Sequence, residues 1–113
     1  MDPVGKHCLI TIRNIQDATI LETFEPLKPL FDTIVTGCNL TVMSQTGFQF
    51  TPVGATYVYV LAESHMSIHT YPELNSAYMD IFCCDLSFNS EMAYRIIKEF
   101  FPGSTLETLE LMR

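Results

Sequence analysis

The chain has few basic residues and no long apolar run. Only 6 of its 113 residues are Lys or Arg, against 13 Asp and Glu, and the six form no cluster. Nucleic-acid backbones are bound by clustered cations, so this balance argues against DNA or RNA binding and suits a cationic small ligand better. No apolar stretch approaches the roughly 18 residues of a membrane-spanning helix. We therefore expect neither a nucleic-acid nor a membrane partner.

The cysteines show no metal-binding or disulfide pattern. Cys8, Cys38, Cys83 and Cys84 contain no C-x-x-C pair, so a zinc site is not indicated. Residues 1–6 lack the apolar core of a signal peptide. We expect an unexported, soluble protein of the cytoplasm, where structural disulfides are rare.

Length and composition predict one folded domain over residues 1–113. Hydrophobic residues make up 48% of the chain, enough to build a single core. A small domain with this apolar content also leaves apolar surface exposed, which could contact a second subunit. We expect a homo-oligomer, most simply a two-fold dimer with its active site at or near the interface.

Hydrophobic periodicity predicts both strands and helices. A helix is expected over about residues 17–36, with a kink or a late start at Pro26 and Pro29. A second helix should begin at a cap on Asn89 or Ser90. The expected strands are 8–12, 40–50, 55–62, 78–84 and, more weakly, 106–111. This order predicts an α+β fold: a two-layer sandwich with helices on one face of a mostly antiparallel sheet.

The most informative segment is 63–73, which follows the most strand-like run. It gathers acids, hydroxyls and imidazoles where a buried strand ends, and polar groups there must be hydrogen-bonded or used. Ser64 could attack the carbonyl of Glu63 and turn the peptide bond into an ester. A base then removes the serine Cα proton, the carboxylate leaves, and hydrolysis gives a pyruvoyl group. Such a group forms a Schiff base with a substrate amine and accepts electrons, as pyridoxal phosphate does.

Three residues supply groups that this chemistry needs. His69 is a candidate base and Thr56 a candidate hydroxyl donor for the oxyanion. Cys84, on a different expected strand, is a candidate acid. Taken alone, Ser64 would more often be a capping or turn residue and Cys84 a core residue, so their meaning depends on the surrounding sequence.

The segment resembles the bacterial and archaeal type of S-adenosylmethionine decarboxylase proenzyme. The run A-E-S-H-x-S-I-H-T-(aromatic)-P-E of that family matches residues 62–73 at nearly every position. The resemblance extends to residues 50–54 and 80–84, and with the order of elements it covers most of the chain. It implies cleavage between Glu63 and Ser64, which leaves a β chain of residues 1–63 and an α chain of residues 64–113 and turns Ser64 into the pyruvoyl cofactor.

The resemblance also implies roles for the other matching residues. His69 takes the Cα proton during processing, and Thr56 stands where the family has a processing hydroxyl. Cys84 protonates the substrate α-carbon after carbon dioxide leaves. Glu73 holds the ribose hydroxyls, and Phe50 stacks on the adenine near the sulfonium, where a π-face against a cation is favourable.

The chain departs from the family pattern at a few positions. The family usually has serine in place of Thr56, whose branched side chain is stiffer, so processing could be slower. Cys83 occupies a position that is often threonine, and the chain ends early, at Arg113. None of these departures removes a functional group that the reaction requires.

The same residues allow other interpretations. His65 and His69 have the spacing of two metal ligands on a helix, but their neighbours do not favour a helix, so we expect no metal and a hydrogen-bonding role for His65. The favoured product is decarboxylated S-adenosylmethionine, the aminopropyl donor for spermidine synthesis. The alternatives are a pyruvoyl-dependent ornithine or arginine decarboxylase on the same fold, and an unprocessed homologue that regulates an active partner.

Overall fold

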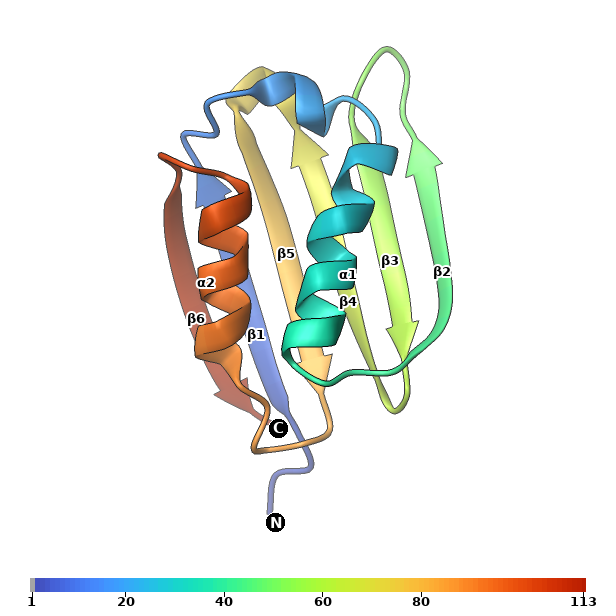
Figure 1. Cartoon of the computed structure of the whole chain (residues 1–113), viewed down its shortest axis with the longest axis vertical. Helices are drawn as coiled ribbons and strands as arrows, with labels where there is room; N and C mark the ends of the chain where they lie inside the picture. The colour runs from blue at the N-terminus through green and yellow to red at the C-terminus, as the bar shows by residue number, and fades with distance from the viewer. Residues whose placement is uncertain (1) are drawn as a thin grey trace.

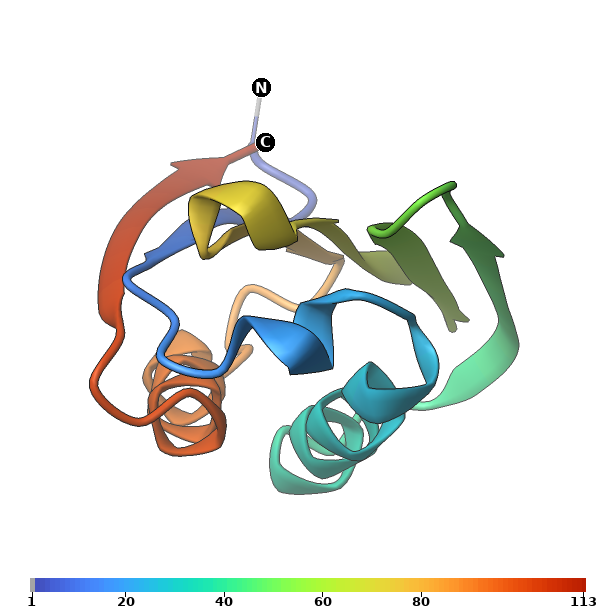
Figure 2. The ribbon, with the colours of Figure 1, turned by 90° about the horizontal axis from the view of Figure 1, so that it is seen from above.

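A computed structural model of the chain describes residues 2–113 and contains a six-stranded antiparallel sheet in the order β2-β3-β4-β5-β1-β6. The strands are β1 (Lys6–Arg13), β2 (Val42–Gln49), β3 (Ala55–Leu61), β4 (Ser64–Tyr71), β5 (Ser76–Cys83) and β6 (Thr105–Met112). The helices α1 (Lys28–Gly37) and α2 (Ser90–Phe100) both lie on one face of the sheet (Figure 1, Figure 2). The predicted α+β two-layer fold is confirmed.

The first helix begins late, as the two prolines predicted. Residues 17–27 form two short 3-10 turns, η1 (Ala18–Leu21) and η2 (Glu25–Leu27), before α1 starts at Lys28. Pro26 and Pro29 each lie in the first turn of their helix. Proline is tolerated there because its missing N–H would have no partner inside the helix.

Strand β4 was not predicted, because its residues are largely polar. The structure shows why the segment is nevertheless a strand: Met66, Ile68 and Thr70 are buried, while the residues between them face the other side. His65, Ser67 and His69 therefore occupy one face of a central strand that pairs with β3 and β5, whereas Ser64 and Thr70 share the face of the buried residues. The pairing on both sides places Ser64 and His69 on a rigid element.

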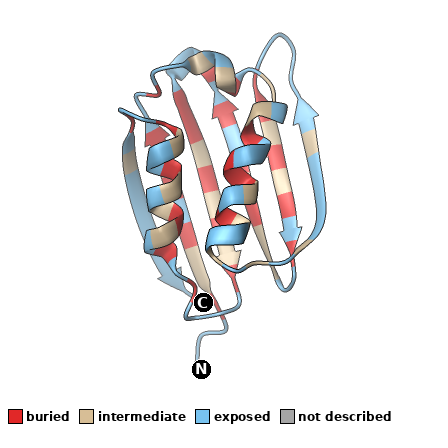
Figure 3. Cartoon of the chain, viewed as in Figure 1, coloured by how far each residue is buried: buried red, intermediate tan, exposed pale blue. Residues whose placement is uncertain are grey.

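The core lies between the helices and one face of the sheet. Leu30 and Ile34 of α1 and Ile97 of α2 are fully buried against alternate residues of the strands. Figure 3 shows these buried positions as stripes on the helices and across the strands. No helix in residues 2–113 is long and apolar enough to cross a membrane.

The opposite face of the sheet, here called the open face, has neither helix over it (Figure 2). It carries His65 and His69 of β4 and Asp80 of β5, which alternate with the buried residues of those strands. It also carries exposed apolar side chains, including Val60, which is 46% exposed, and Leu109, which is 56% exposed. Half-polar and half-apolar, this face suits contact with another protein surface better than plain solvation.

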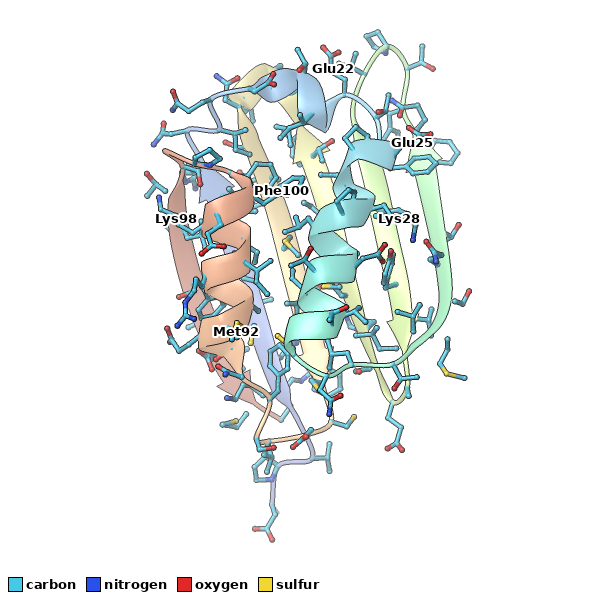
Figure 4. All side chains as sticks on the ribbon, in the orientation of Figure 1. Glu22, Glu25, Lys28, Met92, Lys98 and Phe100 are labelled. Atoms are coloured by element: carbon cyan, nitrogen blue, oxygen red, sulfur yellow. The ribbon has the colours of Figure 1, made fainter. Side chains whose placement is uncertain are left out.

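A polar network fastens α1 to the sheet. The Tyr59 hydroxyl donates to Asp32 Oδ1 at 2.5 Å, and Lys28 Nζ lies 3.0 Å from Asp32 Oδ2. Figure 4 shows Lys28 pointing from α1 toward β3 and β2, where its Nζ also lies 3.4 Å from Gln45 Oε1. The hydrogen bond from Tyr59 and the charge of Lys28 outweigh burial and hold the pKa of Asp32 below its usual value.

Asn89 caps α2, and its removal should weaken the fold. Its side-chain oxygen accepts from the backbone N–H of Met92 at 3.0 Å, which satisfies one of the free donors of the first turn. We expect Asn89→Ala to lower the free energy of unfolding in urea by about 1 kcal/mol. Asn89→Asp, which keeps the acceptor, should stay near wild type; an equal loss in both variants would show that the hydrogen bond to Met92 is not what stabilises the helix.

Candidate active site

The bond between Glu63 and Ser64 lies in a tight hairpin. Leu61 of β3 pairs directly with Ser64 of β4, so Ala62 and Glu63 alone form the turn. Glu63 has φ of 62°, the left-handed conformation that costs a non-glycine residue on the order of 1–2 kcal/mol. A strained residue therefore precedes the serine at the bond that the sequence predicts to break.

A first cavity of about 530 Å³ opens at this hairpin. Glu63, Ser64 and Cys84 line it, together with the end of α1 and the loop before α2. Cys83 is the last residue of β5 and is buried, whereas Cys84 lies just past the end of the strand and is exposed, so the two thiols differ in exposure although both residues line the cavity. Cys83 lies directly opposite Ser64 in the β4–β5 ladder. The predicted nucleophile and the predicted acid thus share one cavity.

A second cavity, of about 290 Å³, contains the other predicted residues. Phe50, Thr56, His69 and Glu73 line it. Thr56 Oγ1 lies 2.9 Å from His69 Nδ1, across the β3–β4 ladder, so the hydroxyl orients the imidazole and leaves Nε2 for another partner. The Phe50 side chain is 48% exposed, which leaves its ring available to a planar ligand.

The hairpin lies at one end of β4 and η3 (Pro72–Leu74) at the other (Figure 1). The first cavity is lined by residues of the hairpin, and the second by residues of η3 and the end of β4 next to it. Ser64 and His69 are five residues apart in an extended strand, or about 16 Å. The cavities share no lining residue. Within one chain His69 cannot exchange a proton with Ser64, although the sequence pattern groups them. His65 and His69, about 13 Å apart for the same reason, cannot share a metal ion.

Asp80 and His7 form a further polar cluster with His65 and were not among the predicted site residues. Asp80 Oδ2 accepts from His7 Nε2 at 2.7 Å and from His65 Nε2 at 2.9 Å, and Ser67 Oγ donates to Oδ1. Burial alone would raise the pKa of Asp80, but these three hydrogen bonds outweigh it and hold that pKa below its usual value. A single acid within the apolar strand 78–84 was the available signal. The expected hydrogen-bonding role of His65 is present, with Asp80 as its partner.

The thiols differ in exposure, which predicts their reactivity. Burial raises the pKa of the Cys38 thiol to about 11 and also raises the pKa of Cys8. Only thiolates react rapidly, so at pH 8 we expect iodoacetamide to modify Cys84 at least about tenfold faster than Cys38. Peptide mass spectrometry over time measures this, and Cys84→Ser should remove the fast reaction. Fast modification of Cys38 in the folded chain would contradict the expectation.

Comparison with known proteins agrees with the geometry. Residues 6–113 match the sequence model of the S-adenosylmethionine decarboxylase family. The chain is 33% identical to the S-adenosylmethionine decarboxylase proenzyme of Methanococcus aeolicus, over all of this chain and 96% of that protein. It is 34% identical to the proenzyme of Thermodesulfovibrio yellowstonii, over all of this chain and 83% of that protein.

A solved structure shows the same fold. The crystal structure of the adenosylmethionine decarboxylase of Aquifex aeolicus superposes with a TM-score of 0.88 at 30% identity, covering all of this chain and 92% of that one. The family match over nearly the whole chain, the relatives and this structure agree with one another. The chain therefore belongs to the S-adenosylmethionine decarboxylase family.

Proposed function

We propose that the chain is a self-processing, pyruvoyl-dependent carboxy-lyase that decarboxylates S-adenosylmethionine. The observation that carries this proposal is the strained Glu63–Ser64 hairpin opening on a cavity that also holds Cys84. Family membership supports the reaction class, because the relatives are named as proenzymes of this decarboxylase. The product, decarboxylated S-adenosylmethionine, is the aminopropyl donor for spermidine synthesis.

Self-cleavage would use the chain's own groups. Ser64 Oγ attacks the carbonyl carbon of Glu63, and the peptide bond becomes an ester. Removal of the Ser64 Cα proton expels the Glu63 carboxylate, and hydrolysis releases ammonia and leaves a pyruvoyl group at the start of the α chain, residues 64–113. The left-handed strain at Glu63 supports this step, because cleavage relieves it.

A second copy of the chain would complete the site. His69 lies about 16 Å along β4 from Ser64 of its own chain. An isologous pairing about a two-fold axis that crosses the strands brings the His69 end of one chain beside the Ser64 end of the other. The exposed apolar residues of the open face, such as Val60 and Leu109, support a face-to-face contact of this kind. We propose a homodimer of αβ units with two such shared sites.

In a shared site each residue would have one role. His69, oriented by Thr56, takes the Cα proton during processing. Phe50 stacks on the adenine and Glu73 accepts hydrogen bonds from the ribose hydroxyls. The pyruvoyl carbonyl supplies the attachment point for the substrate amine and accepts electrons as carbon dioxide leaves. Cys84 then delivers a proton to the substrate α-carbon.

The same observations support S-adenosylmethionine as the substrate and the cytoplasm as the compartment. The relatives above are named for S-adenosylmethionine, and nothing in those names favours ornithine, arginine or a non-catalytic regulator. Phe50 and Glu73 share one cavity, which suits an adenosine group and not a bare basic amino acid.

All four cysteines, each within the described residues, carry free thiols, which suits the reducing cytoplasm.

The first test is the mass of the purified protein under denaturing conditions. We expect two fragments, residues 1–63 and residues 64–113, with the second carrying a pyruvoyl group at its start. Ser64→Ala should give one uncut chain and no decarboxylation, because it lacks the attacking hydroxyl. A wild-type chain that stays whole on long incubation, or that turns over ornithine or arginine faster than S-adenosylmethionine, would refute the proposal.

The proposed role of Cys84 predicts a different result from that of Ser64. Cys84→Ala should still cleave to a substantial extent, because the thiol takes no part in ester formation. Its decarboxylation rate per pyruvoyl group should fall by about 10²-fold or more, the usual effect of losing a positioned proton donor. Cleavage and decarboxylation are measured on the same preparation. If cleavage fell as far as decarboxylation, the division of roles would be wrong.

Mixed dimers test whether the site is shared. Ser64→Ala and His69→Ala chains, each inactive alone, are expressed together with different tags. If chains pair at random, half of the His69→Ala chains meet a partner with an intact His69, so about half of them should cleave. His69→Ala mixed with a Ser64→Ala, His69→Ala double variant is the control: it retains Ser64 in one chain but has no His69 in either, so it should give no cleavage. Absence of cleavage in verified mixed dimers would show that the site is not shared.

A further inference from the structure

We propose that Asp80, acting through His65, is a positioning residue that holds the new chain end in place after self-cleavage. The inference rests on the proposed function, since it requires a cut between Glu63 and Ser64. It concerns residues on the open face that line neither cavity. Within one chain, Asp80 and His65 would therefore influence the reaction through the position of residue 64.

The contacts connect three adjacent strands. Asp80 of β5 accepts from His7 of β1 at 2.7 Å and from His65 of β4 at 2.9 Å, and Ser67 of β4 donates to its other oxygen. The imidazoles also pack on the Phe82 ring, with centroid distances of 5.4 Å from His7 and 6.3 Å from His65. Hydrogen bonds to a carboxylate are stronger than neutral ones, so a half-buried acceptor of three donors holds its partners firmly.

The donor directions favour this hydrogen-bonded arrangement over a metal ion. His7, His65 and Asp80 offer three ligand atoms within 4.8 Å of one another, the donor set of a metal site. However, Arg113 Nη1 lies 3.2 Å from His7 Nδ1, and a guanidinium only donates. His7 Nδ1 must therefore accept, which leaves the ring proton on Nε2, where it donates to Asp80. A metal ion on His7 Nε2 would move that proton to Nδ1, where two donors, His7 Nδ1–H and the Arg113 guanidinium, would face each other.

Cleavage creates the need for such a contact. In the uncut chain the two-residue turn ties Ser64 to Leu61, so the hairpin itself limits its movement. After the cut, residue 64 becomes a chain end, and chain ends fray unless other contacts hold them. His65 is the very next residue, and its ring is bonded to Asp80 of the neighbouring strand. The reactive group at residue 64 must stay within its site, because small displacements from productive geometry are costly.

The test compares Asp80→Ala with Asp32→Ala. Both remove a half-buried carboxylate that accepts two or more hydrogen bonds, but Asp32 holds α1 and contacts neither Ser64 nor His65. We expect both variants to unfold at lower temperature and both to cleave. Only Asp80→Ala should lose activity, by about tenfold or more in kcat per pyruvoyl group, as expected for lost support of a site residue. Its amides at residues 65–67 should also exchange hydrogen faster in the cut form.

Two further variants separate the hydrogen bonds from the fold. Asp80→Asn can still accept from both imidazoles through its amide oxygen and donate to Ser67, so it should recover most of the activity. His65→Phe keeps a ring against Phe82 but has no donor to Asp80, so its kcat per pyruvoyl group should fall as far as that expected for Asp80→Ala. This variant also provides the test if Asp80→Ala fails to fold. Equal kcat per pyruvoyl group in His65→Phe and wild type would overturn the inference.

The outcomes distinguish this inference from the proposed function. A wild-type chain that never cleaves overturns both, because no new chain end then exists. A wild-type chain that cleaves and decarboxylates, alongside an Asp80→Ala variant no less active than Asp32→Ala, overturns only the positioning role. Slower cleavage together with unchanged turnover in Asp80→Ala would overturn it as well, since the contact would then act before the cut and not after it.

Discussion

The extended geometry of β4 is the constraint on which the whole site depends. Ladders to β3 and β5 on either side hold this strand, so it cannot bend to bring its ends together. Ser64 and His69 stay about 16 Å apart, far beyond the roughly 3 Å reach of a proton transfer. Two polar groups that are adjacent in one sequence motif therefore lie at opposite ends of a rigid strand. The proposed second copy of the chain, in antiparallel orientation, is the simplest means of joining them.

Much of the fold could be predicted from apolar periodicity, because packing against one core imposes that periodicity. The stripe on α2 and the alternation in β3 are examples, and the prolines correctly delayed α1. Strand β4 escaped prediction because only its buried half, with Met66 and Ile68, carries the signal, whereas its open face is polar. Its place in the sheet depends on pairing with β3 and β5, which no local pattern reveals.

The candidate residues could be named from the sequence, but their arrangement could not. A short motif states which groups are present, whereas the distances among them follow from strand pairing and from where cavities form. Thr56 and His69 meet because register sets them opposite each other. Asp80 was not predicted as a site residue because its partners His7 and His65 are distant from it in sequence. Only the strand order β4-β5-β1 makes the three residues neighbours.

The same strand pairing explains how the chain could be cut without losing its fold. The β3–β4 ladder runs from Thr56–His69 to Leu61–Ser64, and none of these pairings needs the covalent bond at Glu63. The proposed cleavage would relieve the left-handed strain at Glu63 and leave the sheet paired, so it would loosen the new chain end alone. The added mobility is confined to the first residues after the cut, so one nearby contact is enough to limit it. The hydrogen bond from His65 to Asp80 lies one residue from the proposed cut, on the face of the sheet away from the core. In that position it can hold the chain end without disturbing the packing of the core.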